Sequence, residues 1–105
     1  MITIEIFYTD HCITRLRVTG HALTAPHGQD IICAGVSALT QSAVLGLQCH
    51  LKRKLIVHVA AGELDCALGS VPDALSEAIL HTMLLGLTEI AKINPQRVQI
   101  KEHRR

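Results

Sequence analysis

Alternating apolar and polar positions mark five short segments of the chain as strands. The first segment places Ile2, Ile4 and Ile6 on one face, and a period of two is typical of a half-buried strand. After a turn at residues 9–11, the same alternation through Leu16 and Val18 predicts a second strand that ends near residues 20–21. The other three segments carry the alternating sets Leu55, Val57, Val59; Leu64, Cys66, Leu68; and Val98, Ile100.

Two segments with helical spacing separate these strands. Between about residues 30 and 51, apolar side chains recur at three- and four-residue steps, which predicts one buried stripe. Pro72 opens the second helix, because its fixed φ suits a first helical turn, and Asn94-Pro95 ends it. The expected buried stripes are Ile32, Val36, Leu39, Ala43 and Leu47 in the first helix, and Leu75, Ile79, Met83, Gly86 and Ile90 in the second.

The order of these elements, β-β-α-β-β-α-β, predicts an α+β fold of two layers. Hairpins combined with two helices favour a mixed or antiparallel sheet with both helices packed on one face. The chain has 105 residues and shows no linker or repeat, so we expect a single domain over residues 1–105. Both helices are apolar over more than half of their circumference, so we expect a homodimer that buries the surplus apolar surface.

Composition and charge exclude several classes of function. The formal net charge is +1 and charged residues make up 18% of the chain, which argues against disorder and against binding dominated by phosphate contacts. Aromatic residues make up 2%, so almost no platform exists for stacking nucleic-acid bases. We expect a cytoplasmic protein with reduced cysteines, because no signal-peptide pattern opens the sequence and polar residues interrupt the apolar stretch at residues 31–47.

Four cysteines and seven histidines are many for so short a chain. The cysteines lack the CxxC pairs that mark zinc ribbons. A zinc site built from His11-Cys12 and Cys49-His50 is disfavoured, because adjacent residues point apart in a strand or a helix. Cys66 lies on the apolar face of its predicted strand, so we expect it in the core. Neither a metal nor a disulfide framework is therefore expected.

Cys33 is placed differently, near the start of the first predicted helix. We expect Asp30 to be the N-cap, which makes Cys33 the third helical residue and places it beside Ser37, away from the apolar stripe. The helix N-terminus favours the thiolate but supplies only about 0.3–1 kcal/mol at an exposed site. A reactive thiolate therefore needs a cationic partner, and the loop before the helix offers two candidates, His21 and His27.

The residues around Cys33 match a known pattern. The motif GHA at residues 20–22 and the motif GQDIICAGVSAL at residues 28–39 resemble the ribosomal-processing cysteine protease family called Prp. These residues carry nearly all of the specific match, while the rest of the chain agrees in length and in the order of its elements. Ile32 and Gly35 stand where Val and Ala are common in that family, and a glycine inside a helix costs about 1 kcal/mol.

The resemblance implies a small cytoplasmic homodimer that removes the N-terminal extension of a ribosomal protein precursor, number twenty-seven of the large subunit, by cutting after an aromatic residue. It implies Cys33 as the nucleophile and His21 as the general base and acid, with no cofactor. Asp30 is the nearest carboxylate in sequence that could orient His21, although capping would already occupy it. The resemblance also implies a mobile substrate loop, which would contain Ala22, Pro26, His27, Gly28 and Gln29.

The expected chemistry is acyl transfer through a thioester at Cys33. Backbone N–H groups of Cys33 and Ala34, or of residues 28–29, are the expected donors to the oxyanion. The rival hypothesis is a non-catalytic adaptor that binds ribosomes or RNA, and its binding should weaken steeply with salt. That adaptor would use the basic residues Arg15, Arg17, Lys52, Arg53, Lys54, Arg104 and Arg105.

Overall fold

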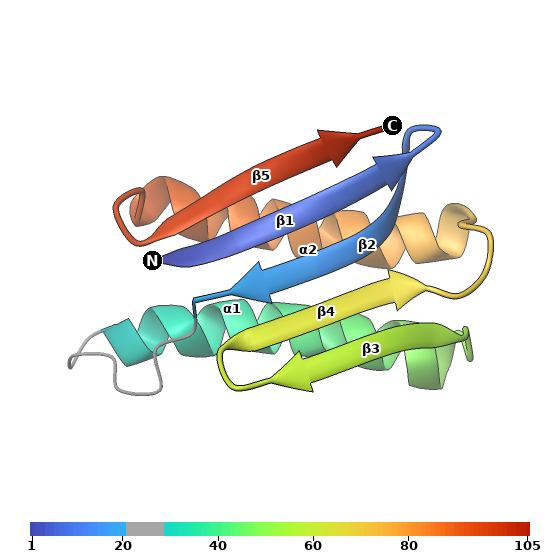
Figure 1. Cartoon of the computed structure of the whole chain (residues 1–105), viewed down its shortest axis with the longest axis horizontal. Coiled ribbons are helices and arrows are strands. Elements are labelled where there is room, and N and C mark those ends of the chain that lie inside the picture. Colours follow the sequence, from blue (N-terminus) through green and yellow to red (C-terminus); the bar gives the residue numbers. More distant parts are fainter. Residues whose placement is uncertain (21–28) are drawn as a thin grey trace.

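The computed structural model describes residues 1–20 and 29–105 of the chain. They form one five-stranded sheet with both helices on the same face (Figure 1), which confirms the α+β class and the predicted order of elements. The strands are β1 (Ile2–Thr9), β2 (Cys12–Thr19), β3 (Leu55–Ala60), β4 (Glu63–Leu68) and β5 (Val98–Arg104), and the helices are α1 (Gln29–Leu45), its π-helical continuation η1 (Gly46–His50) and α2 (Ala74–Ile93).

The sheet is mixed, which is one of the two arrangements expected. The strand order is β3-β4-β2-β1-β5. β1 pairs antiparallel with β2 and parallel with β5, while β4 pairs antiparallel with both β2 and β3. Parallel strands need a long crossover connection, and α2 supplies it by carrying the chain from β4 across the sheet to β5 (Figure 1).

The core lies between the sheet and the two helices. The alternation predicted for β1 is confirmed, because Ile2, Ile4 and Ile6 are all buried. Most of the stripe predicted for α1 also points inward, and Thr40, which lies outside the predicted stripe, is buried as well. Its hydroxyl donates a hydrogen bond of 2.9 Å to the carbonyl oxygen of Val36. This bond removes the cost of burying a polar group, so a polar residue fits the apolar stripe.

The stripe predicted for α2 is only partly confirmed, because Met83 is buried and Ile79 and Ile90 pack half-buried against the core, whereas Leu75 is exposed. The residues that α2 buries are Ser76, Leu80, Met83 and Leu87, of which only Met83 was expected, and Leu75 is 57% exposed. Two of the other predicted residues, Ile79 and Ile90, are half-buried and lie against glycines of the first helical segment. The apolar surface of α2 is thus divided between the sheet and the neighbouring helix, and a single stripe could not describe both.

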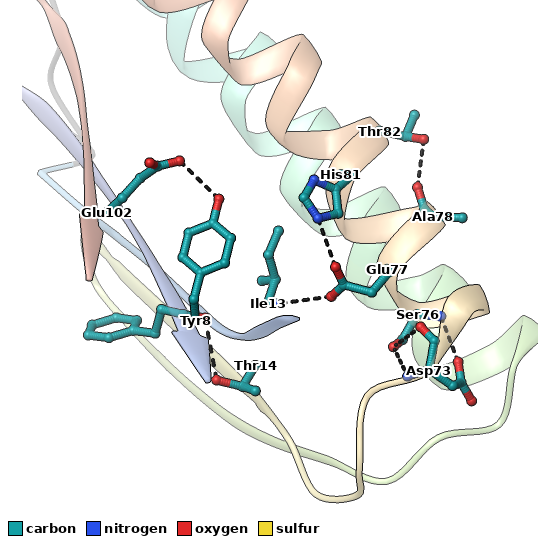
Figure 2. Close-up of polar contacts among 11 residues, drawn as sticks. Tyr8, Ile13, Thr14, Asp73, Ser76, Glu77, Ala78, His81, Thr82 and Glu102 are labelled. Atoms are coloured by element: carbon teal, nitrogen blue, oxygen red, sulfur yellow. Dashed lines mark hydrogen bonds and ion pairs between the residues drawn. The ribbon is translucent and has the colours of Figure 1, made fainter. Parts of the chain in front are cut away.

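The start of α2 is set by Asp73 and not by Pro72. The carboxylate of Asp73 accepts a hydrogen bond of 2.9 Å from the N–H of Ser76, and the hydroxyl of Ser76 accepts one of 3.0 Å from the N–H of Asp73 (Figure 2). These two bonds form a capping box, which satisfies two free donors. The N–H of Ser76 and the guanidinium of Arg53 lower the pKa of Asp73. The ion pair between Arg53 and Asp73 also ties the connection after η1 to the start of α2.

The two helices approach each other closely at glycines. At each of these positions an aliphatic side chain of the opposite helical segment lies in tight contact with the position of an added Cβ atom. The absence of a Cβ therefore lets the two backbones come close together while the interface stays tightly packed. A Cβ would lie 3.3 Å from Ile90 Cδ1 at Gly35, 3.3 Å from Ile79 Cδ1 at Gly46, and 2.9 Å from Leu39 Cδ1 at Gly86.

By length and hydropathy alone, both helical segments could cross a membrane. The segment Ile31–His50 has a mean hydropathy of 1.5 and Ala74–Ile93 has a mean hydropathy of 1.2. The polar residues in the first segment thus reduce its hydropathy less than we expected. In this fold each segment packs one face against the core and leaves apolar side chains on its outer face, namely Ile31, Leu45, Leu75, Leu85 and Ile93.

We predict opposite effects for two alanine substitutions at the helix interface. Gly35→Ala is expected to raise the free energy of unfolding by up to about 1 kcal/mol, because alanine is the better helix former and the end of Ile90 needs to move only slightly. Gly86→Ala is expected to lower it, because the contact with Leu39 is tighter. Urea unfolding of both variants measures the difference, and a more stable Gly86→Ala protein would contradict this account of the interface.

Candidate active site

Cys33 lines a cavity of about 150 Å³ at one end of the sheet. The thiol residue is half-buried and packs against the core, so it is less separated from the apolar stripe than its position on a helical wheel suggested. The other walls come from the start of β1, the end of β2 and the connection before β5. The residues that line this cavity with Cys33 are Met1, Ile2, Gly20, Ile32, Gln96 and Arg97.

The first helix begins at Gln29, two residues earlier than an N-cap at Asp30 implies. Asp30 therefore lies within the first turn and is not the N-cap, Gln29 belongs to the helix and not to the loop, and Cys33 is the fifth helical residue. In an α-helix the N–H of each residue bonds to the carbonyl four residues earlier. In a helix that begins at Gln29, the N–H groups of Cys33 and Ala34 fall at positions that bond within the helix, so they are less suited to hold an oxyanion than we expected. The first four N–H groups have no partner within the helix.

Several predicted site residues lie outside the part of the chain that the structure describes. These are His21, Ala22, Pro26, His27 and Gly28, together with the side chains of Gln29 and Asp30. The structure does place Gly20, the residue directly before His21, in the wall of the Cys33 cavity. The chain therefore leaves β2 toward His21 from a point beside the thiol.

Gly20 is held by its backbone. Its N–H donates a hydrogen bond of 3.1 Å to the carbonyl oxygen of Gly62, in the turn between β3 and β4. Its φ of 89° lies in the left-handed region, which glycine adopts readily and other residues rarely do. A Cβ atom at this position would also overlap the carbonyl oxygen of Met1. The glycine of the GHA motif is therefore required by the geometry at the end of β2.

The cavity also contains two residues that sequence reasoning missed, Gln96 and Arg97. They are far from Cys33 in sequence, and the parallel pairing of β1 with β5 brings them to the cavity. At the start of that pairing, the N–H of Ile2 donates a hydrogen bond of 2.8 Å to the carbonyl oxygen of Arg97. No local sequence signal indicates such a long-range contact.

The other cysteines differ from Cys33 in their surroundings. Cys66 is buried as predicted, and burial raises the pKa of its thiol to about 11. Cys12 is half-buried and Cys49 is exposed, and all four thiols are free. Over residues 1–20 and 29–105, no group of three or more His, Cys, Asp or Glu residues could hold a metal ion. Cys33 thus differs from the other three in being a half-buried thiol in the wall of a cavity of about 150 Å³.

Most of the basic residues proposed for an adaptor are paired with carboxylates. Nε of Arg15 donates to Oδ1 of Asp65 at 2.8 Å, and this contact lowers the pKa of Asp65. Nη2 of Arg17 lies 3.3 Å from Oε1 of Glu63. These pairs on the open sheet face leave little net positive charge there. Arg53 and Arg104 form the further pairs Arg53–Asp73 and Arg104–Glu102.

Comparison with known proteins decides the family. The family model described as Cysteine protease Prp matches residues 1–99. The chain belongs to the Prp family. The Ribosomal processing cysteine protease Prp of Bacillus subtilis (strain 168) is 51% identical over 35 residues, which span 33% of this chain and 31% of that relative. The resemblance recognised in the sequence is therefore confirmed.

Solved structures of similar proteins, among them a Prp protease, share the whole fold. The essential ribosomal processing protease Prp from S. aureus, solved with a covalently linked product peptide, is 25% identical, with a TM-score of 0.87 over 97% of this chain and 99% of that one. The protein SMU.848 from Streptococcus mutans is 23% identical, with a TM-score of 0.91 over 100% of this chain and 99% of that one. The mixed sheet with two helices is thus the Prp fold.

We predict that Gly20→Ala destabilises the protein more than Gly62→Ala does. Both glycines have positive φ, 89° and 72° respectively, and an L-residue in this region costs about 1–2 kcal/mol. At Gly20 the new methyl group would also overlap the carbonyl oxygen of Met1, so the start of β1 would have to move. Thermal unfolding of both variants tests this prediction, and equal losses of Tm would contradict it.

Proposed function

We propose that this chain is a cysteine endopeptidase that removes the N-terminal extension of a ribosomal protein precursor, number twenty-seven of the large subunit, during ribosome maturation. The observation that carries the proposal is the cavity that Gly20 and Cys33 both line, because it places the residue before His21 in the wall of the same cavity as a half-buried thiol. The covalently linked product peptide of the S. aureus relative supports a reaction of this class. We further propose that the protein acts in the cytoplasm as a homodimer, which would cover outer helix faces such as Leu85 and Ile93.

In the proposed mechanism, the Cys33 thiolate attacks the carbonyl carbon of the scissile peptide bond. The tetrahedral intermediate collapses as His21 donates a proton to the departing amine, which leaves a thioester on Cys33. His21 then removes a proton from water, which attacks the thioester and releases the product carboxylate and the thiolate. The N–H groups of the first turn of α1, including those of Gln29 and Asp30, are the donors that we propose for the oxyanion.

A cleavage assay with the precursor tests this function. The wild-type protein is expected to shorten a peptide that spans the precursor junction, and mass spectrometry locates the cut. Cys33→Ala is expected to abolish cleavage, because no thiolate remains to form the thioester. His21→Ala is expected to reduce kcat at least about 100-fold, since general acid–base catalysis contributes roughly that much. Full cleavage by Cys33→Ala would exclude Cys33 as the nucleophile. Full cleavage by His21→Ala would exclude His21 as the general base and favour His27 instead.

Thiol alkylation provides a test that needs no substrate. Iodoacetamide is expected to label Cys33 faster than Cys49, although Cys49 is more exposed, because a catalytic thiol is held as the thiolate. Cys66 is expected to stay unlabelled in the folded protein, since burial raises its pKa to about 11. Peptide mapping after short reaction times measures each rate. Equal rates at Cys33 and Cys49 would favour the adaptor hypothesis.

A further inference from the structure

A second, larger hollow lies between α1 and the β3–β4 hairpin. Its volume is about 390 Å³, and we call it the α1–β3 groove. Val57 and Val59 of β3 point into it and remain 41% and 69% exposed, because the inner face of this edge strand is not filled by helix side chains. The wall from α1 is formed by Ser37, Gln41, Val44 and Leu45.

The α1–β3 groove adjoins the cavity of Cys33. Gly20 lines the cavity and Gly62 lines the groove, and the hydrogen bond of 3.1 Å between them joins the two walls. Ser37 lies one helical turn after Cys33 and opens the groove on the α1 side. Figure 1 shows the β3–β4 turn and the start of α1 at the same end of the sheet. A peptide chain that leaves Cys33 along α1 therefore enters the groove directly.

The distance from Cys33 to the far end of the groove at Leu45 suits a short extended peptide. From Cys33 to Leu45 the helix rises by about 18 Å at ~1.5 Å per residue. An extended chain covers this distance in about five or six residues at ~3.3 Å each. The residues nearest Cys33, Ser37 and Gln41, can exchange hydrogen bonds with a peptide backbone, while the far end is apolar, with Val44 and Leu45 opposite Val57.

We propose that the α1–β3 groove binds the apolar segment of the peptide substrate on one side of the scissile bond, so that Val57 and Val59 determine specificity. This inference rests on the proposed function. The edge of β3 that is not paired with β4 offers free backbone groups beside the groove, to which an extended peptide can add as a further strand. The occupant is then a peptide with apolar side chains at alternate positions.

The chain offers a matched pair of variants on one strand. Val59 is 69% exposed and lies in the groove, whereas its near neighbour Ile56 is 68% exposed but lies outside it, on the opposite face of β3. The substitutions Val59→Ser and Ile56→Ser therefore remove similar side chains from equally exposed positions of the same strand. Neither residue belongs to the core, so both variants are expected to fold.

The experiment measures peptide binding and peptide cleavage separately. Binding of a fluorescent precursor-junction peptide is measured by anisotropy in a Cys33→Ser background, which cannot form the thioester. Val59→Ser is expected to weaken binding about five- to tenfold, because a valine contact is lost, and Ile56→Ser is expected to leave it unchanged. A second peptide, whose apolar residues are replaced by serine, is expected to bind weakly and to be insensitive to Val59→Ser.

The outcomes separate this proposal from the proposed function. If the wild-type protein fails to cut the precursor peptide, the proposed function is wrong. Peptide binding in the Cys33→Ser background still tests whether the groove binds the peptide. Equal affinities of Val59→Ser and Ile56→Ser, or no binding at all, would overturn the groove proposal. Sedimentation of both variants completes the test, because dissociation of a dimer by Val59→Ser with unchanged peptide affinity would identify a second copy as the occupant and overturn the proposal as well.

Discussion

The close approach of α1 and α2 is the constraint on which the rest of the structure depends. Three glycines admit aliphatic side chains of the opposite helical segment, so the two helices pack as a narrow pair. Helices packed about 8–10 Å apart cover a width of roughly 20 Å, whereas five strands at ~4.8 Å spacing extend over about 24 Å. The pair therefore leaves an edge of the sheet incompletely covered, and in this protein that edge is β3, where Val59 stays exposed.

This incomplete cover connects packing to function. A wider helix pair would fill the space beside β3 with core side chains and leave only the small cavity at Cys33. Because the groove and the cavity share the backbone contact between Gly20 and Gly62, recognition of an extended peptide and attack on its carbonyl can occur on adjacent surfaces. The fold thus provides a binding surface without a deep pocket, which a domain of this size has little volume to build.

Local patterns predicted the elements well, and contacts between distant segments limited the rest. Strand periodicity in β1 identified the correct core face, because each residue there has a single neighbouring layer. The stripe of α2 was only partly correct because its apolar residues divide between two partners: Leu87 is buried in the core, whereas Ile90 also packs against Gly35. The predicted start of α1 was wrong for a different reason. Asp is a residue type common at N-caps, but Asp30 lies inside the first turn of this helix.

The candidate site shows the same division. Cys33 could be singled out because its position near a helix start is a local feature, and the motif around it is specific. Arg97 could not be found, since it joins the cavity only through the pairing of β5 with β1. The carboxylate partners of Arg15 and Arg17 come from β4 and β1, and they too depend on strand pairing. The pairing of these arginines and the full lining of the cavity thus became visible only in the folded structure.

The open face of the sheet is poorly suited to bind RNA. Phe7, the single phenylalanine, is stacked on His103 with ring centroids 4.6 Å apart, and the guanidinium carbon of Arg15 lies 4.6 Å from its ring centroid. An aromatic ring with these partners has little free surface on which a base could stack. Since Arg15 is also paired with Asp65, neither the stacking nor the charge that an RNA-binding sheet needs is available there. The apolar α1–β3 groove beside the cavity of Cys33 is thus the surface better suited to a partner, and that partner is a peptide.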